Sequence, residues 1–121
     1  MARPGDSLSL RLAVEADLTA LEALMLAAMA ELLSPFLTPA QVAASHAIMG
    51  LDTQLVADGT YFVVEAAGAL AGCGGWSRRA TLFGGDHSTG RDAALLDPRR
   101  AAARVRAMYT HPAFTRRGVG R

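Results

Sequence analysis

The sequence contains no lysine, a single cysteine and few aromatic residues, and each shortage excludes something. All 12 basic residues are arginines, whose planar, forked donors suit phosphate. Because Cys73 is the single cysteine, no disulfide can form within the chain, and the cysteine and three histidines lack metal-ligand spacing. We therefore expect no metal ion and a reducing, cytoplasmic compartment. Aromatic residues make up only 6% and do not alternate with the arginines, which argues against nucleic acid as a partner.

Long hydrophobic runs are also missing. The N-terminal residues MARPGDSLSLRL contain no apolar segment of signal-peptide length. The longest apolar stretch, residues 18–33, is interrupted by Glu22 and Glu31 and is too short to cross a bilayer. The sequence therefore predicts no membrane partner.

The remaining composition is that of one folded domain over residues 1–121. Hydrophobic residues make up 51% and charged residues 19%, which allows a buried core and excludes disorder. Residues 1–75 carry two arginines and eight acidic residues, whereas residues 76–121 carry ten arginines and three acidic residues. This asymmetry predicts an anionic partner for the C-terminal part, although a codon bias that also enriches alanine and glycine would produce the same pattern.

The N-terminal half shows one strand and two helices. Alternating leucines predict a strand over residues 8–12, and apolar residues spaced by three and four predict a helix from about residue 18 to just before Pro35. Thr38-Pro39-Ala40-Gln41 has the pattern of a capping box and predicts a second helix that runs to about Met49.

The second half predicts three more strands. Residues 61–65 and 70–76 should pair as a hairpin through Ala67-Gly68, and the glycines of the second strand predict a bulge or a close approach of the backbone there. Residues 77–103 read as a long loop with a short helix near 98–103, followed by a strand over residues 104–110. The fold class is therefore α/β, with a mostly antiparallel mixed sheet, flanking helices and the order β-α-α-β-β-β.

The last six residues, Arg116-Arg117-Gly118-Val119-Gly120-Arg121, are the segment most suited to binding. Glycine allows positive φ and close approach of a ligand to the main chain, and successive N–H groups can form an anion-binding nest. A helix beginning here would strengthen the attraction for phosphate. The segment matches neither a Walker loop nor a dinucleotide fingerprint. These residues therefore predict a pyrophosphate cradle.

The run from Val105 to Gly120 resembles the acetyl-CoA-binding segment of the GNAT superfamily of N-acetyltransferases. That family has a strand, a His-Pro or similar pair, and then Gln/Arg-x-x-Gly-x-Gly/Ala; here His111-Pro112 follows the strand. The order of elements upstream is similar too. The resemblance implies a GNAT-like acyl-CoA N-acyltransferase fold and an enzyme that moves an acetyl group from acetyl-CoA to a primary amine of a small molecule or peptide.

The resemblance also implies which residues hold the co-substrate. Main-chain groups of Met108, Tyr109 and Thr110 would pair with the pantetheine arm, and amides of the closing turn would hold the pyrophosphate. One departure is Thr115, which stands where the family usually has Gln or Arg. The expected acetyl-CoA-binding residues are Met108, Tyr109, Thr110, Thr115, Arg116, Arg117, Gly118, Val119, Gly120 and Arg121.

The catalytic residues do not follow from the sequence. Glu65, at the end of a strand near the middle of the sheet, is the carboxylate to test first as a general base. Domains of the family continue beyond this motif, so we expect an incomplete fold, the N-terminal part of a GNAT domain without turnover of its own. Three alternatives stay open: a non-catalytic CoA-binding or regulatory module, a nucleic-acid binder, and an inactive fragment. A homodimer is a further open possibility.

Overall fold

The computed structural model describes residues 7–45, 50–80, 86 and 93–121. Within these residues the chain forms four strands, three α-helices and two short 3-10 turns. In chain order they are β1 (Leu8–Leu12), η1 (Glu15–Asp17), α1 (Leu18–Leu33), α2 (Pro39–Ser45), α3 (Thr53–Ala57), β2 (Tyr61–Ala66), β3 (Ala69–Ser77), β4 (Arg104–Thr110) and η2 (Pro112–Phe114).

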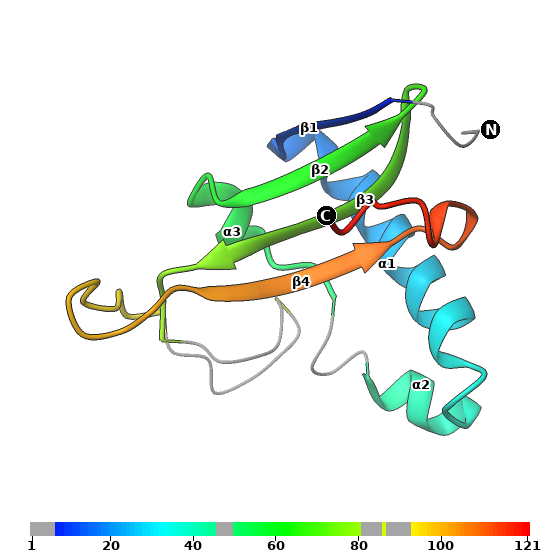
Figure 1. Cartoon of the computed structure of the whole chain (residues 1–121). Helices are drawn as coiled ribbons and strands as arrows, with labels where there is room; N and C mark the ends of the chain where they lie inside the picture. The colour runs from blue at the N-terminus through cyan, green and yellow to red at the C-terminus, as the bar shows by residue number, and fades with distance from the viewer. Residues whose placement is uncertain (1–6, 46–49, 81–85, 87–92) are drawn as a thin grey trace.

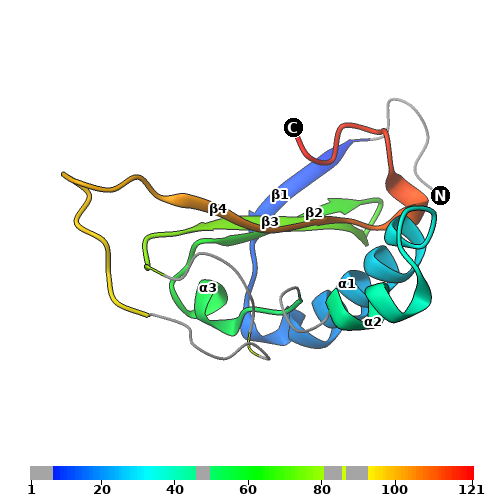
Figure 2. The same ribbon diagram turned by 90° about the horizontal axis from the view of Figure 1, so that it is seen from below.

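The four strands form one sheet in the order β1-β2-β3-β4. We expected a mostly antiparallel sheet, and all three described pairings are antiparallel. The three helices lie on one face of this sheet, and the C-terminal turn lies over the opposite face (Figures 1 and 2). β4, like β1, stands at an end of the strand order, so its outer edge is a place where a further strand or an extended ligand could pair.

The predicted helix starts are confirmed where the structure describes them. The amide of Thr38 donates to Gln41 Oε1 at 2.9 Å, and the amide of Gln41 donates to Thr38 Oγ1 at 3.2 Å, so the capping box is formed. The expected end of this helix near Met49 lies outside the described residues. Residues 98–101 form turns rather than the expected short helix, since Asp97 accepts the amides of Arg100 and Ala101 in a single turn.

The core lies between α1 and the helix-facing side of the sheet. α1 buries one stripe of its surface because its apolar residues recur every three or four positions. The stripe consists of Leu21, Leu24, Met25, Ala28 and Met29. It packs with Tyr61 and Val63 of β2 and with Cys73 of β3, all of which are buried. Among the described residues, no helix has both the length and the apolar character needed to cross a membrane.

The sheet contains two irregularities that depend on small residues. The β2–β3 register shifts between Val64 and Glu65, and the β3–β4 register shifts between Cys73 and Gly75. The predicted irregularity in the glycine-containing strand is therefore confirmed. A Cβ on Gly75 would lie 2.3 Å from the Thr60 carbonyl oxygen, so only glycine lets β2 and β3 approach this closely.

Candidate functional site

A bulge in β4 is the most unusual piece of main chain in the sheet. Tyr109 pairs with Cys73 and Arg106 pairs with Gly75, so the residues 107–108 of β4 face the single residue Gly74 of β3. Ala107 has φ of 51°, a left-handed conformation that is costly for a residue with a Cβ. Something in the surrounding structure must therefore hold this bulge in place.

The hydroxyl of Tyr61 holds the bulge from the buried side. It donates to the carbonyl oxygen of Ala107 at 2.6 Å and lies 3.2 Å from Cys73 Sγ. Only 2% of Tyr61 is exposed. Burial raises the pKa of the Tyr61 phenol far above its usual value and raises the pKa of the Cys73 thiol to about 11. Both groups are therefore neutral at physiological pH and act through hydrogen bonding and packing.

A buried ion pair connects the residue before the bulge to α3. Arg106 Nη2 lies 3.7 Å from Asp52 Oδ2, and both side chains are buried. The Asp52 carboxylate also accepts the amide of Gln54 at 3.2 Å and so caps the N-terminus of α3. Removal of either charge would remove this ion pair from a buried environment and destabilise the contact. The ion pair therefore ties the position of β4 to that of α3.

The segment after β4 folds back onto the sheet. The amide of Ala113 donates to His111 Nδ1 at 3.1 Å, which caps η2, and Phe114 is buried. The Arg117 guanidinium lies over the Phe114 ring, 5.7 Å from its centre. Val119 packs on Gly72 so closely that a Cβ on Gly72 would lie 2.4 Å from Val119 Cγ1. These contacts place the last turn against the face of the sheet that the helices do not cover, called the open face below.

A cavity of about 370 Å³ lies where this turn meets the open face. Its walls come from all four strands and from the C-terminal turn. The lining residues are Leu10, Phe62, Val64, Cys73, Gly74, Gly75, Trp76, Val105, Met108, Tyr109, Thr110, Val119, Gly120 and Arg121. The lining is apolar except near Thr110 and the turn, as expected for a pocket that holds an organic chain with a charged end.

A second hollow of about 280 Å³ lies on the helix side of the same strand. α1 forms one wall, and Met108, Tyr109 and Thr110 form the other. The same three residues of β4 therefore border a cavity on each face of the sheet. This stretch of the sheet edge is accessible from both sides.

The structure brings six of the ten expected acetyl-CoA-binding residues together in the first cavity, namely Met108, Tyr109, Thr110, Val119, Gly120 and Arg121. The other four lie in the preceding turn. Thr115 Oγ1 donates to the Pro112 carbonyl at 3.3 Å, so its hydroxyl supports the turn. Arg116 and Gly118 both have positive φ, 61° and 83°. The contact with the Phe114 ring fixes the orientation of the Arg117 guanidinium.

Glu65 lies apart from the cavity, although its neighbour Val64 lines it. The Glu65 carboxylate accepts from Arg11 Nε at 2.9 Å, and the same guanidinium donates to both oxygens of Asp17. The Arg11 hydrogen bonds lower the pKa of Asp17 to about 2. This cluster ties β1, β2 and η1 together, which explains a charged residue at position 65 without a catalytic role.

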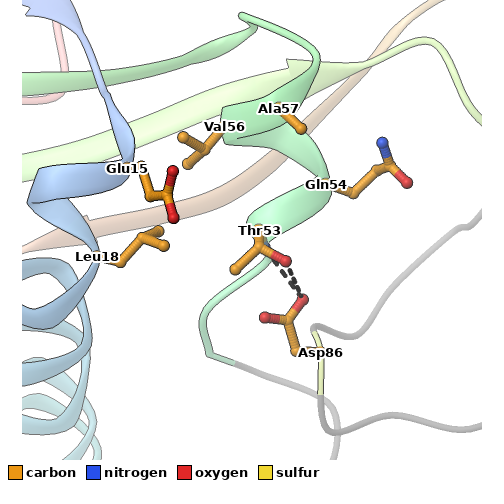
Figure 3. Close-up of a pocket in the computed structure, with 7 residues that line it drawn as sticks. All are labelled: Glu15, Leu18, Thr53, Gln54, Val56, Ala57 and Asp86. Atoms are coloured by element: carbon orange, nitrogen blue, oxygen red, sulfur yellow. Dashed lines mark hydrogen bonds between the residues drawn. The ribbon is translucent and has the colours of Figure 1, made fainter.

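A cavity of about 540 Å³, larger than the two beside β4, lies elsewhere, between η1, the start of α1 and α3 (Figure 3). Two carboxylates, Glu15 and Asp86, line it together with Thr53. The amide and hydroxyl of Thr53 both donate to Asp86 Oδ1, at 3.0 and 3.1 Å. The Asp86 carboxylate is therefore held at the start of α3, and we assign no ligand to this cavity. In the described ranges, no group of His, Cys, Asp and Glu could hold a metal ion.

No protein-family model matches the sequence, and neither a curated protein nor a solved structure matches it. The structure itself defines the class of the protein as an α/β fold in which the described strands form a four-stranded antiparallel sheet. The resemblance to the GNAT superfamily stays a prediction based on residues 105–120 and on the site described above.

Several lining residues were not singled out from the sequence, notably Leu10, Phe62 and Val64. A signal for them exists in the run from Tyr61 to Val64, which is apolar at four successive positions. Such a run predicts a strand with apolar surroundings on both faces. Tyr61 was also missed, because nothing local in the sequence reveals a hydrogen bond to a residue 46 positions away.

Proposed function

We propose that β4 and the C-terminal turn form the acetyl-CoA site of an N-acetyltransferase that acetylates a primary amine. The observation that carries this proposal is the cavity shared by Met108–Thr110 and Val119–Arg121. It combines, within one hollow, an accessible sheet edge and a basic, glycine-containing turn. The resemblance of residues 105–120 to the GNAT donor-binding segment assigns the same two parts to the same ligand.

The turn suits a pyrophosphate. A Cβ on Gly120 would meet no heavy atom within 4 Å, so the main chain is open to an approaching ligand there. The positive φ of Arg116 and Gly118 curves the turn, as an anion-binding nest requires. Arg116, Arg117 and Arg121 supply positive charge beside it. Residues 115–120 form turns and bends, so the dipole of a helix is not part of this support.

The edge of β4 suits the pantetheine arm. The amide of His111 donates to the Ala71 carbonyl at 2.8 Å, so Tyr109, two residues earlier, also directs its main-chain groups toward β3. Thr110, between them, directs its N–H and C=O toward the free edge, and Met108 does the same on the other side of Tyr109. An extended amide-bearing chain can pair with these groups as an added strand.

The chemistry requires few protein groups. A neutral amine nitrogen attacks the thioester carbonyl carbon, a C–N bond forms, and the C–S bond then breaks to release coenzyme A as a thiolate. The proton lost by the nitrogen goes to a base, and the thiolate gains one from an acid or from water. A main-chain N–H of β4 directed at the carbonyl oxygen would stabilise the negative charge that develops there. Holding both reactants side by side supplies much of the remaining rate advantage.

Calorimetric titration of the full chain with acetyl-CoA tests the proposal. We expect a dissociation constant in the micromolar range, within the roughly 1 μM to 1 mM typical of enzyme substrates. Gly120→Val should weaken binding about tenfold or more, because it fills open space beside the ligand without a clash in the free protein. The control Arg99→Ala removes an exposed arginine, paired with Asp97, from the same basic half and should bind normally.

Absence of heat with the folded wild-type chain would overturn the proposal. Release of free thiol from acetyl-CoA in the presence of a primary amine would contradict the expectation that this chain has no turnover of its own. Binding without such release fits both an incomplete acetyltransferase domain and a non-catalytic CoA-binding module. Equal loss of binding in Arg99→Ala and Gly120→Val would point to general charge attraction, as in a nucleic-acid binder, and steep salt dependence would accompany it.

A further inference from the structure

The Tyr61 hydroxyl reaches the bulge of β4 from the buried side of β2. Its hydrogen bond to the Ala107 carbonyl oxygen is short, at 2.6 Å. The residue it holds is one of three described non-glycine residues with positive φ. A short bond from a side chain that is 98% buried to a strained carbonyl indicates a positional role for that carbonyl.

The geometry of the peptide bond extends this role to the next residue. The carbonyl of Ala107 and the N–H of Met108 belong to one planar trans peptide unit, so they point in opposite directions. Because the Ala107 carbonyl points to the Tyr61 hydroxyl in the core, the Met108 N–H points away from it. Met108 lines the cavity on the open face, and its side chain is 56% exposed.

We propose that Tyr61 is a positioning residue that orients the Ala107–Met108 peptide and so aims the Met108 N–H at the thioester carbonyl of the donor. This inference rests on the proposed function, because it assumes that acetyl-CoA occupies the β4 edge. Tyr61 itself touches no substrate. Its hydroxyl sets the direction of a main-chain donor on the opposite side of the strand.

Neighbouring residues make the arrangement rigid. Gly74 stands opposite the bulge, where a Cβ would lie 2.9 Å from Met108 Cγ, so the Met108 side chain lies across a glycine. On the other side, Arg106 is held by Asp52. Loss of the Tyr61 hydroxyl would therefore leave the strand in place and free only the peptide unit at the bulge.

The test compares two ligands on the wild type and on Tyr61→Phe. S-ethyl-coenzyme A has the chain length of acetyl-CoA but lacks the thioester carbonyl. The wild type should bind acetyl-CoA about threefold to tenfold more tightly, the value of one hydrogen bond. Tyr61→Phe should lose this preference while it keeps most of its affinity for S-ethyl-coenzyme A. If the Tyr61 hydroxyl had only a structural role, its loss would weaken the binding of both ligands by the same factor.

Ser77→Ala is the control, since it also removes a buried hydroxyl, one that accepts the Arg79 amide at 3.1 Å, but it lies outside the cavity. It should keep the wild-type preference. If Tyr61→Phe does not fold, the test uses the wild type alone and follows its Met108 amide resonance. Acetyl-CoA should shift this resonance and S-ethyl-coenzyme A should not.

The outcomes separate the two proposals. No binding of either ligand by the wild type overturns the proposed function and this inference with it. Binding of both ligands with equal affinity by the wild type, or an unchanged preference in Tyr61→Phe, overturns the inference alone. An equal shift of the Met108 amide resonance by both ligands also overturns the inference alone.

Discussion

At the scale of single residues, the account depends most on Ala107. Its left-handed φ of 51° costs about 1–2 kcal/mol, more for a β-branched side chain. Ala107→Val should therefore lower the free energy of unfolding by about 2 kcal/mol, whereas Ala107→Gly should change it by less than about 1 kcal/mol. Urea denaturation of the two variants measures this. Equal stability of the valine and glycine variants would show that the bulge is not held in this conformation.

Cys73 gives a second prediction at this scale. Burial raises the pKa of its thiol to about 11, so roughly a thousandth of it is ionised at pH 8. We expect a thiol reagent such as DTNB to react with the folded chain at least a hundred times more slowly than with the chain in 6 M guanidinium chloride. Rapid reaction of the native protein would contradict the packing of Cys73 beneath Tyr61.

Asp17 predicts a pH dependence. The Arg11 hydrogen bonds hold its pKa at about 2 in the folded protein, below the usual value of about 4 in the unfolded chain. The contribution of this carboxylate to stability is therefore complete above about pH 4 and is lost as the pH falls toward 2. Thermal unfolding between pH 2 and 6 should show a smaller decrease for Asp17→Asn than for the wild type. Identical profiles would mean that Asp17 is not paired in solution.

At the scale of elements, the docking of the C-terminal turn on β3 is decisive. Val119 packs on the bare backbone of Gly72, where a Cβ would lie 2.4 Å from Val119 Cγ1 and 2.9 Å from the Tyr109 carbonyl oxygen. Gly72→Ala should therefore destabilise the fold by about 1–3 kcal/mol and displace the turn. The double variant Gly72→Ala/Val119→Ala, in which the side chain that packs on residue 72 is shorter, should recover part of the lost stability. Urea denaturation of the wild type, the single variant and the double variant measures this. A fully stable single variant would contradict this docking.

Most elements could be predicted from the sequence because local patterns determine them. Alternating leucines predicted β1, three-and-four spacing predicted α1, and the Thr38–Gln41 pattern predicted the formed capping box. The residues 104–110 were predicted as a strand and form β4 with the same bounds. The prediction of a short helix near residue 98 was wrong, since the described main-chain hydrogen bonds there form only the single turn that begins at Asp97.

The site was less predictable because its parts are distant in sequence. The Gly/Arg turn and Met108–Thr110 came from a local motif, and the structure brings the ends of both into one cavity. Leu10 and Val64 reach that cavity only through strand pairing, and Tyr61 reaches the bulge across 46 residues. Long-range pairing of this kind leaves no short-range pattern in a single sequence.

At the scale of the whole molecule, the two faces of the sheet differ. The helices cover one face, while the other presents Leu10, Val105 and Met108 to solvent, each more than half exposed. The exposed apolar side chains surround the cavity of about 370 Å³, and the basic turn lies over one side of it. An apolar hollow with Arg121 in its lining fits a ligand with an organic arm and a phosphate end.

The most direct test of this central claim is a titration of the ¹⁵N-labelled chain with acetyl-CoA, followed by the amide resonances. The account predicts that the largest shifts cluster at two places, Met108 to Thr110 on β4 and Arg116 to Arg121 in the turn. Resonances around the cavity beside α3, such as Gln54, should stay unchanged. Shifts centred on α3, or a spectrum unaffected by millimolar acetyl-CoA, would contradict it.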